Sequence, residues 1–284
     1  MKKKFLSIAV CLCMIMTTIP GGVLQPDVAW AAVHTSHCVC GGSTDIGDHT
    51  AHNSDTAWTG VSNLTDITQA GNYYLTDNVT LTETWKPVNG TVLCLDGKTI
   101  TANGDFEAVN VQEGISFTLT DCESEGTVGK VTHAGGATGS GVKIEGNLTM
   151  YGGSITGNMA ETRGGGIYIN KTGTFTMYDG IISKNAATAP KNMGCYGGGV
   201  CNVGGTFTMY DGTISGNNAA QGGGVYSSVR GAVNMSGGSI SGNTAKTYGG
   251  GILNMEGSFN MTAGNITGNK VTSSEYGNGG GVYN

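Results

Sequence analysis

Six histidines and cysteines near the N-terminus form the densest group of metal-binding side chains in this 284-residue chain. Imidazole nitrogen and thiolate sulfur are the usual ligands of structural zinc, which takes four of them in a tetrahedron. However, the Cys-x-Cys spacing is tighter than that of zinc fingers, and the stretch is rich in Gly and Thr. We therefore expect a flexible leader, with a disulfide and no cofactor, and keep zinc as the alternative. The residues concerned are His34, His37, Cys38, Cys40, His49 and His52.

Two aspartates occupy equivalent places in neighbouring repeats and could do carbohydrate chemistry. Polysaccharide lyases use clustered carboxylates to hold Ca²⁺ beside a basic residue, and glycoside hydrolases use two carboxylates at a set distance. Asp179 and Asp211 could stack a few Å apart, but each precedes a glycine, which is a turn signal. Since the matching positions of the other repeats are Gly or Ala, we expect no catalytic residue here.

Four cysteines beyond the leader could form two disulfides. Cys195 and Cys201 flank one glycine run, and Cys94 and Cys122 lie about one repeat length apart. An exported protein is free to form both bonds, although connectivity does not follow from spacing.

These residues are positioned by a repeat in which three phrases alternate. Glycine runs followed by Val or Ile recur at offsets of 25 to 33 residues, from Gly141 to Gly281. The second phrase reads GNLTM, GTFTM (twice), GAVNM and GSFNM, and the third is Ile-x-x-Asn. Periods of this size are typical of solenoids.

Each phrase is short, alternates with period two and is bounded by Gly or Asn, which predicts a β-strand. Three strands per repeat predict an all-β fold, a right-handed parallel β-helix solenoid with three short strands per coil. Coils about 4.8 Å apart place like residues over like, so Met, Ile and mostly Phe columns should fill the interior. Stacked Asn side chains should hydrogen-bond between coils. The expected methionine column is Met150, Met177, Met209, Met235 and Met261.

The phrases GGGIY (Gly164 to Tyr168), GGGVY (Gly222 to Tyr226) and ISGN (Ile214 to Asn217) carry a family resemblance. They resemble the GGA-[ILV] and F-x-x-N tetrapeptides of the chlamydial polymorphic membrane protein repeat, and more broadly bacterial right-handed β-helix surface proteins. The resemblance implies an exported β-helix used in adhesion. This sequence departs from those tetrapeptides in two ways: Gly replaces Ala at the third position of the first, and Ile replaces Phe at the first position of the second.

Length variation is concentrated at one corner of the expected coil, between each Asn of the third phrase and the next glycine run. Insertions at one face of a solenoid often build its binding surface, although surface loops also tolerate length for no functional reason. The expected contacts to a glycan or a surface protein are Arg163, Lys191, Tyr196, Tyr248 and Tyr276.

The chain begins with the layout of a secretory signal peptide: three lysines, an apolar stretch and an Ala-x-Ala site ending at Ala31. We expect a signal peptide over 1–31, the Cys/His leader over 32–60, irregular coils and a cap over 61–138, and regular repeats over 139–284, truncated in the sixth. No transmembrane segment is expected after signal removal. Association with an outer membrane would need a barrel supplied by a further C-terminal region.

The expected function is therefore that of a secreted or cell-surface bacterial protein, not an enzyme, that presents loops from a rigid rod for adhesion or cell-envelope interaction. A host or environmental glycan or surface protein is the expected partner. Nucleic acid is disfavoured by the net charge of −6. The alternatives are a polysaccharide lyase or glycoside hydrolase with its site outside the regular repeats, and a passive structural spacer.

Overall fold

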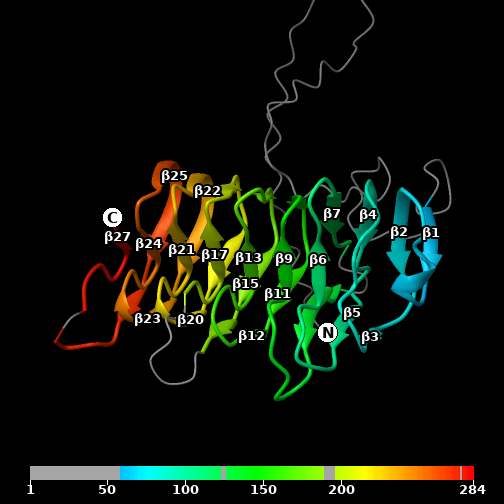
Figure 1. Ribbon diagram of the computed structural model, residues 1–284, viewed down its shortest axis with the longest axis horizontal. Helices are drawn as coiled ribbons and strands as arrows, with labels where there is room; N and C mark the ends of the chain where they lie inside the picture. The colour runs from blue at the N-terminus through cyan, green and yellow to red at the C-terminus, as the bar shows by residue number, and fades with distance from the viewer. Residues whose placement is uncertain (1–57, 123–125, 189–195, 276) are drawn as a thin grey trace, which may run out of the picture. The chain divides into compact units, whose positions relative to one another are not determined.

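A computed structural model describes residues 58–122, 126–188, 196–275 and 277–284 of the chain. All described residues belong to one compact unit. In these ranges the strands β1 to β27 are accompanied by the short 3-10 helix η2 (Leu64–Asp66). The strands pair in parallel, and the neighbours of each strand come from other coils, as in the series β6, β9, β13, β17, β21 and β24 (Figure 1). The fold is therefore all-β and compatible with a parallel β-helix. None of the helices in the described ranges has the length and apolar character needed to cross a membrane.

Four parallel ladders build the unit, and we name them by their sequence features. The methionine ladder holds the second phrase of each repeat, and its strands are β1 (Trp58–Val61), β2 (Gly71–Leu75), β4 (Thr91–Cys94), β7 (Ser116–Thr120), β10 (Asn147–Met150), β14 (Thr174–Met177) and β18 (Thr206–Met209). The isoleucine ladder holds the third phrase, and its strands are β3 (Val79–Leu81), β5 (Thr99–Ala102), β8 (Lys130–His133), β11 (Ser154–Thr156), β15 (Ile181–Ser183) and β19 (Thr213–Ser215). Two long strands belong to both ladders and join them into one sheet, β22 (Ala232–Ser241) and β25 (Ser258–Thr267).

The other two ladders lie on either side of each glycine run in the sequence. The glycine–valine ladder follows the run, and its strands are β6 (Val109–Val111), β9 (Val142–Ile144), β13 (Ile167–Ile169), β17 (Val200–Val203), β21 (Val225–Ser228), β24 (Ile252–Asn254) and β27 (Val282–Tyr283). The short ladder precedes it, and its strands are β12 (Met159–Ala160), β16 (Ala186–Ala187), β20 (Asn218–Gln221), β23 (Thr244–Tyr248) and β26 (Lys270–Val271).

A regular coil thus has four strands, for example β9 to β12, where the sequence predicts three. The additional short ladder starts directly after the asparagine column, because the next N–H bonds to the asparagine carbonyl of the preceding coil. Ala186 N donates to Asn158 O in this way at 2.9 Å. Strands as short as two residues carry no alternating pattern, so the sequence indicates only a loop there.

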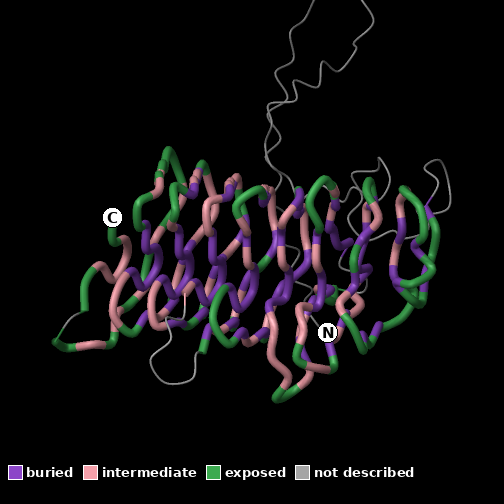
Figure 2. Tube along the Cα trace, in the orientation of Figure 1, coloured by how far each residue is buried: buried purple, intermediate pink, exposed green. Residues whose placement is uncertain are grey.

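The inward side chains form one hydrophobic core, seen as the buried residues along the strands in Figure 2. The predicted methionine column is confirmed, since Met150, Met177, Met209, Met235 and Met261 pair in register from coil to coil. The first four are buried, whereas Met261 is 39% exposed because β25 lies in the last described coils and pairs only with β22 there.

The turn between β1 and β2 buries two apolar side chains. Leu64 and Ile67 pack into the core, and Asn63 caps η2 by accepting a hydrogen bond from Thr65 N at 3.0 Å. The other residues of this turn are exposed, and a cap over the early coils stays a prediction.

An asparagine ladder runs through five coils beside the isoleucine column, as predicted. Each side-chain Nδ2 donates to the Oδ1 of the asparagine in the next coil, at 2.9 to 3.1 Å. Each backbone N–H before the last rung donates to the same oxygen, at 2.9 to 3.0 Å. The first four rungs are buried, and the members are Asn158, Asn185, Asn217, Asn243 and Asn269.

The third glycine of each run packs against this ladder. A Cβ on Gly199 would lie 2.6 Å from Gly224 O of the next coil and 3.0 Å from Asn217 Nδ2. The same contacts recur at Gly166, Gly224 and Gly251. This close approach explains why the third position of each run is glycine.

Candidate functional site

Three of the predicted binding residues come together at the end of the short ladder. Arg163 pairs with Tyr196, Tyr196 with Gln221, and Gln221 with Tyr248, each one coil further on. Arg163 is exposed and the two tyrosines are half-buried. The insertion corner therefore places these side chains in one column across four coils.

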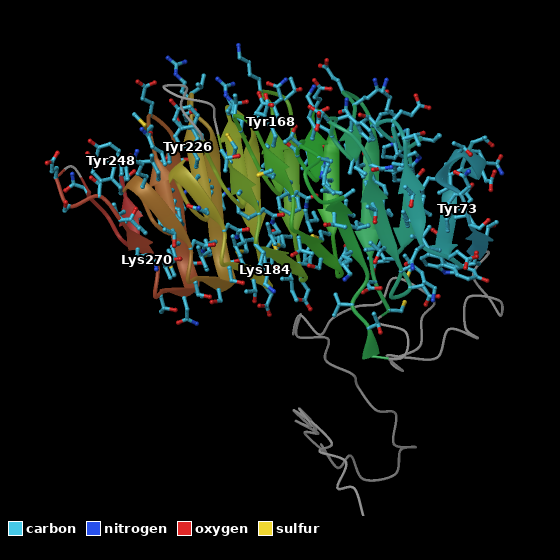
Figure 3. All side chains as sticks on the ribbon, turned by 90° about the horizontal axis from the view of Figure 1, so that it is seen from below. Tyr73, Tyr168, Lys184, Tyr226, Tyr248 and Lys270 are labelled. Atoms are coloured by element: carbon cyan, nitrogen blue, oxygen red, sulfur yellow. The ribbon has the colours of Figure 1, made fainter. Side chains whose placement is uncertain are left out.

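A second column lies beside the first, on the outer side of the glycine–valine ladder. Because side chains alternate along a strand, the residue after each buried Val or Ile points outward. The register aligns Tyr168, Cys201, Tyr226, Leu253 and Tyr283 in this way. In Figure 3, Tyr168, Tyr226 and Tyr248 lie along one side of the strands, and Lys184 and Lys270 lie on the opposite side.

The two columns pack against each other into one cluster, which we name the tyrosine face: Arg163, Tyr168, Tyr196, Tyr226 and Tyr248. The ring centroids of Tyr196 and Tyr226 are 4.6 Å apart with a tilt of 31°. Cys201 and Leu253 are fully buried beneath these rings. The tyrosine face is thus a packed surface with its own apolar base.

A groove of about 720 Å³ lies at the N-terminal end of the tyrosine face, and we name it the acidic groove. One wall carries Arg163, Tyr168 and Tyr196, and the other comes from the irregular coil that ends in β6. Its ionisable side chains are three carboxylates and one guanidinium: Asp105, Glu107, Glu161 and Arg163.

A smaller groove of about 290 Å³ lies on the other side of Arg163 and Tyr196, which line both. It has fewer charged side chains, Arg163 and Glu256, and its lining also includes Val229 and Met255 beside Tyr226. Both Val229 and Met255 are exposed, at 50% and 44%.

The turn that contributes Val229 to this smaller groove has a strained backbone. Val229 has φ 55° and Arg230 has φ 64°, a left-handed conformation that β-branched residues rarely adopt. The next coil holds this turn, since Arg230 N donates to Glu256 O at 3.0 Å. Strained backbone of this kind is often found at binding sites.

Hydrogen bonding and burial set the electrostatics of the tyrosine face. A hydrogen bond between Arg163 and the side chain of Tyr168 raises the pKa of the guanidinium, so its charge is secure. Burial raises the pKa of Tyr226 and raises that of the Cys201 thiol to about 12. Tyr226 is therefore a neutral hydrogen-bonding group, and the Cys201 thiol is not a nucleophile.

The aspartate pair lies at a different corner, after the methionine ladder. The N–H of Gly180 donates to Asp179 Oδ1 at 2.6 Å, and that of Gly212 donates to Asp211 Oδ1 at 2.7 Å. Burial raises the pKa of Asp179, and the neighbouring charge of Asp211 adds to the increase. The geometry agrees with the turn interpretation of both residues.

Three tyrosines stack beside this aspartate corner, where the sequence analysis expected no feature. The rings of Tyr151 and Tyr178 have centroids 4.7 Å apart, and those of Tyr178 and Tyr210 are 4.8 Å apart, both nearly parallel. They stack one ring upon the next in successive coils, so each ring presents mainly its edge. This arrangement supplies a matched comparison for the tyrosine face.

The cysteine predictions have mixed outcomes. The Sγ atoms of Cys94 and Cys122 lie 3.3 Å apart, one coil from each other, which is contact but longer than a bond of about 2.05 Å. Cys122 is disulfide-bonded, and at this distance Cys94 is not the cysteine bonded to it, so the structure does not contain the predicted Cys94–Cys122 bond. Cys201 is a buried thiol in the structure, and Cys195 lies outside the described residues, so the Cys195–Cys201 bond remains only a prediction.

Several predicted site residues lie outside the described ranges: Lys191, Tyr276 and the whole Cys/His leader, His34, His37, Cys38, Cys40, His49 and His52. Within the described part of the chain, no group of three or more His, Cys, Asp or Glu side chains is placed to hold a metal ion.

Sequence reasoning missed Tyr168, Tyr226 and Gln221, which complete the columns. The sequence pattern could have indicated the two tyrosines, because each directly follows the Val or Ile after a glycine run and so takes an outward position on the strand. Asp105 and Glu107 had none, because they belong to an irregular coil. No family model matches the chain, and neither a curated protein nor a solved structure matches it.

Proposed function

We propose that this chain is an exported bacterial cell-surface or secreted protein, a right-handed parallel β-helix that binds a glycan on its tyrosine face. Its role is adhesion or cell-envelope interaction without catalysis. The observation that carries the proposal is the alignment of Arg163, Tyr196 and Tyr248 in one column across four coils, with a groove on each side of the Arg163–Tyr196 pair.

The composition of the grooves supports a glycan as ligand. Half-buried tyrosines offer apolar ring surface with a polar hydroxyl, which suits the mixed faces of a sugar. Carboxylates and a guanidinium supply acceptors and donors for sugar hydroxyls. Since the acidic groove carries three carboxylates against one arginine, an uncharged chain fits better than a polyanion.

Glycan-array binding with the full chain, followed by titration of the best ligand, tests this proposal. Tyr196→Ala and Arg163→Ala should each weaken binding at least about tenfold, which is about 1.4 kcal/mol. Tyr151→Ala is the matched control, because its half-buried ring also stacks on a neighbouring tyrosine but lies outside both grooves. It should leave the affinity unchanged.

Equal loss in all three variants would point to general unfolding, and retention in all three would reject the tyrosine face as the glycan site. A chain that binds no glycan but binds cells through this face would make a surface protein the partner. A chain that binds neither would favour the passive spacer.

One observation favours an enzyme as the second candidate: Glu107 and Glu161 share the acidic groove with Arg163. Glycoside hydrolysis uses two carboxylates that flank the scissile bond. Incubation with neutral and anionic polysaccharides, followed by reducing-end and unsaturated-product assays, tests this alternative. Product release that Glu161→Gln abolishes would replace adhesion by catalysis.

A further inference from the structure

His133 is the only histidine in the described part of the chain, and the proposed function does not use it. It ends β8, is 7% exposed, and lies in the coil before the asparagine ladder begins. Its Nδ1 lies 2.8 Å from Asn158 Oδ1, and its Nε2 lies 2.7 Å from the Phe106 carbonyl oxygen. Both ring nitrogens therefore face an oxygen at hydrogen-bond distance.

The orientation of the Asn158 amide is fixed by its other partners. Its nitrogen lies 3.0 Å from Asn185 Oδ1, 3.2 Å from Val131 O and 3.3 Å from Thr156 O. A flipped amide would put its oxygen against three oxygens and would break the polarity of the whole ladder. The atom that faces His133 is therefore an amide oxygen, which only accepts hydrogen bonds.

The second partner is unambiguous, because a backbone carbonyl has no proton to donate. A neutral imidazole carries one N–H and one lone pair, so one of its nitrogens would repel the oxygen that it faces. Only the imidazolium donates from both nitrogens. We propose that His133 is a structural imidazolium, which clamps the groove-lining segment around Phe106 to the head of the asparagine ladder.

The surroundings favour a positive charge at this place. The ladder amides all point their oxygens toward the preceding coil, so the negative end of five aligned dipoles meets the ring. Asp105 and Glu107 flank Phe106 in sequence, and Glu161 and Arg163 follow Asn158. The remaining ionisable residue on β8 is the exposed Lys130.

The packing leaves no room to rearrange the contact. A Cβ on Gly139 would collide with the Phe106 carbonyl and would lie 2.7 Å from His133 Nε2. Asp105, on the same segment, accepts hydrogen bonds from the N–H and hydroxyl of Thr138 at 2.8 and 3.1 Å. Loss of one ring proton must therefore release either Phe106 or Asn158.

Protonation of His133 thus couples to one wall of the acidic groove, which includes Asp105, Phe106 and Glu107. The folded structure requires both ring protons, so the stability from these two bonds is present at acidic pH. It is lost as the pH rises and the ring gives up a proton. This inference stands independently of which ligand the groove takes.

Nitrogen-15 NMR of the full chain with all four leader histidines replaced by asparagine tests the inference, because His133 is then the sole imidazole. We expect two ring N–H groups at neutral pH, and on alkaline titration the amides of Asp105 to Ala108 should shift with the ring. A single ring N–H at neutral pH would overturn the imidazolium. Ring titration without a shift of those amides would overturn the clamp.

A second variant gives an independent readout. In His133→Gln, the change in Tm between about pH 6 and about pH 8 should be smaller than in the parent chain, because the titrating group is gone. Lys130→Gln, which changes an exposed residue on the same strand, is the control and should keep the parent's change. An unaltered change in His133→Gln would count against the proposal, and if this variant fails to fold, the NMR experiment still decides.

Discussion

At the scale of single residues, the third glycine of each run is a position that has no room for a side chain. A Cβ on Gly199 would meet a backbone oxygen of the next coil and two side chains, those of Asn217 and Ile214, that belong to the buried columns. Gly199 is not required for a left-handed backbone conformation, because its φ is not positive. The requirement for glycine is steric.

Gly199→Ala is therefore expected to lower the free energy of unfolding by about 1–3 kcal/mol, the usual effect of overpacking. Gly135→Ala is the matched control, since a Cβ there meets no atom within 4 Å and its φ is also not positive. Urea unfolding of both variants measures the difference. If Gly199→Ala unfolds with the same midpoint as Gly135→Ala, the coils are less tightly stacked than described.

Cys201 gives a prediction about reactivity. Burial raises its pKa to about 12, so at mildly alkaline pH it carries roughly a thousandfold less thiolate than an unfolded cysteine. Iodoacetamide should therefore leave Cys201 unlabelled in the folded protein and label it after unfolding without reductant, as peptide mass spectrometry would show.

Labelling that appears only after reduction would instead establish a disulfide, and the prediction of a Cys195–Cys201 bond would then hold. Rapid labelling of the folded chain would mean that the tyrosine face opens readily.

At the scale of elements, the asparagine ladder supplies hydrogen bonds at a corner of the coil, where backbone groups would otherwise have no strand partner. Each inner side chain accepts two hydrogen bonds and donates two. One of the donated bonds goes to a backbone carbonyl of the preceding coil, as from Asn217 to Ile182 O at 2.9 Å. Buried groups that lose such partners cost about 1–3 kcal/mol each.

Asn217→Ala should accordingly reduce the free energy of unfolding by about 3 kcal/mol or more, because several buried groups lose their partner together. Asn260→Ala is the control: it removes one exposed bond, from Asn260 Nδ2 to Asn234 Oδ1, and should change stability by less than about 1 kcal/mol. Chemical denaturation with both variants gives the comparison. Similar losses in the two would contradict a structural ladder.

The elements that could be predicted from the sequence are those whose pattern repeats. The methionine, isoleucine and asparagine columns follow from alternation and from a constant order of phrases, and Phe175 stacks on Phe207 as expected, at 5.0 Å. The fourth, short ladder could not be predicted, because two-residue pairing leaves no period. The acidic groove could not be predicted either, because the pairing between coils brings Asp105 and Glu107 close to residues that lie more than 50 positions later in the sequence, Glu161 and Arg163.

At the scale of the whole described unit, each regular coil contacts mainly the coil before and after it. Stability in such a stack is approximately a sum over neighbours. Thr206 pairs with Ala232 of the next coil, so residues 206–231 correspond to one full register repeat. Their removal joins Gly205 to Ala232 and aligns Phe175 with Val233.

We expect this deletion to fold, with an unchanged β-type far-UV circular dichroism per residue and one cooperative thermal transition. Removal of 206–218, half of that segment, is the control. It shifts the register by part of a coil and should abolish cooperative unfolding. If both deletions behave alike, the coils are not interchangeable units.

The asparagine ladder also bears on how the molecule ages chemically. Deamidation starts when the backbone nitrogen of the following residue attacks the side-chain carbonyl carbon of asparagine. In the ladder that nitrogen is already engaged, since Asn218 N, Thr244 N and Lys270 N each donate to an asparagine carbonyl of the preceding coil at 2.8 to 2.9 Å. The ladder asparagines should therefore keep their amides during long storage, while exposed Asn–Gly sites such as Asn103–Gly104 convert to aspartate and isoaspartate first.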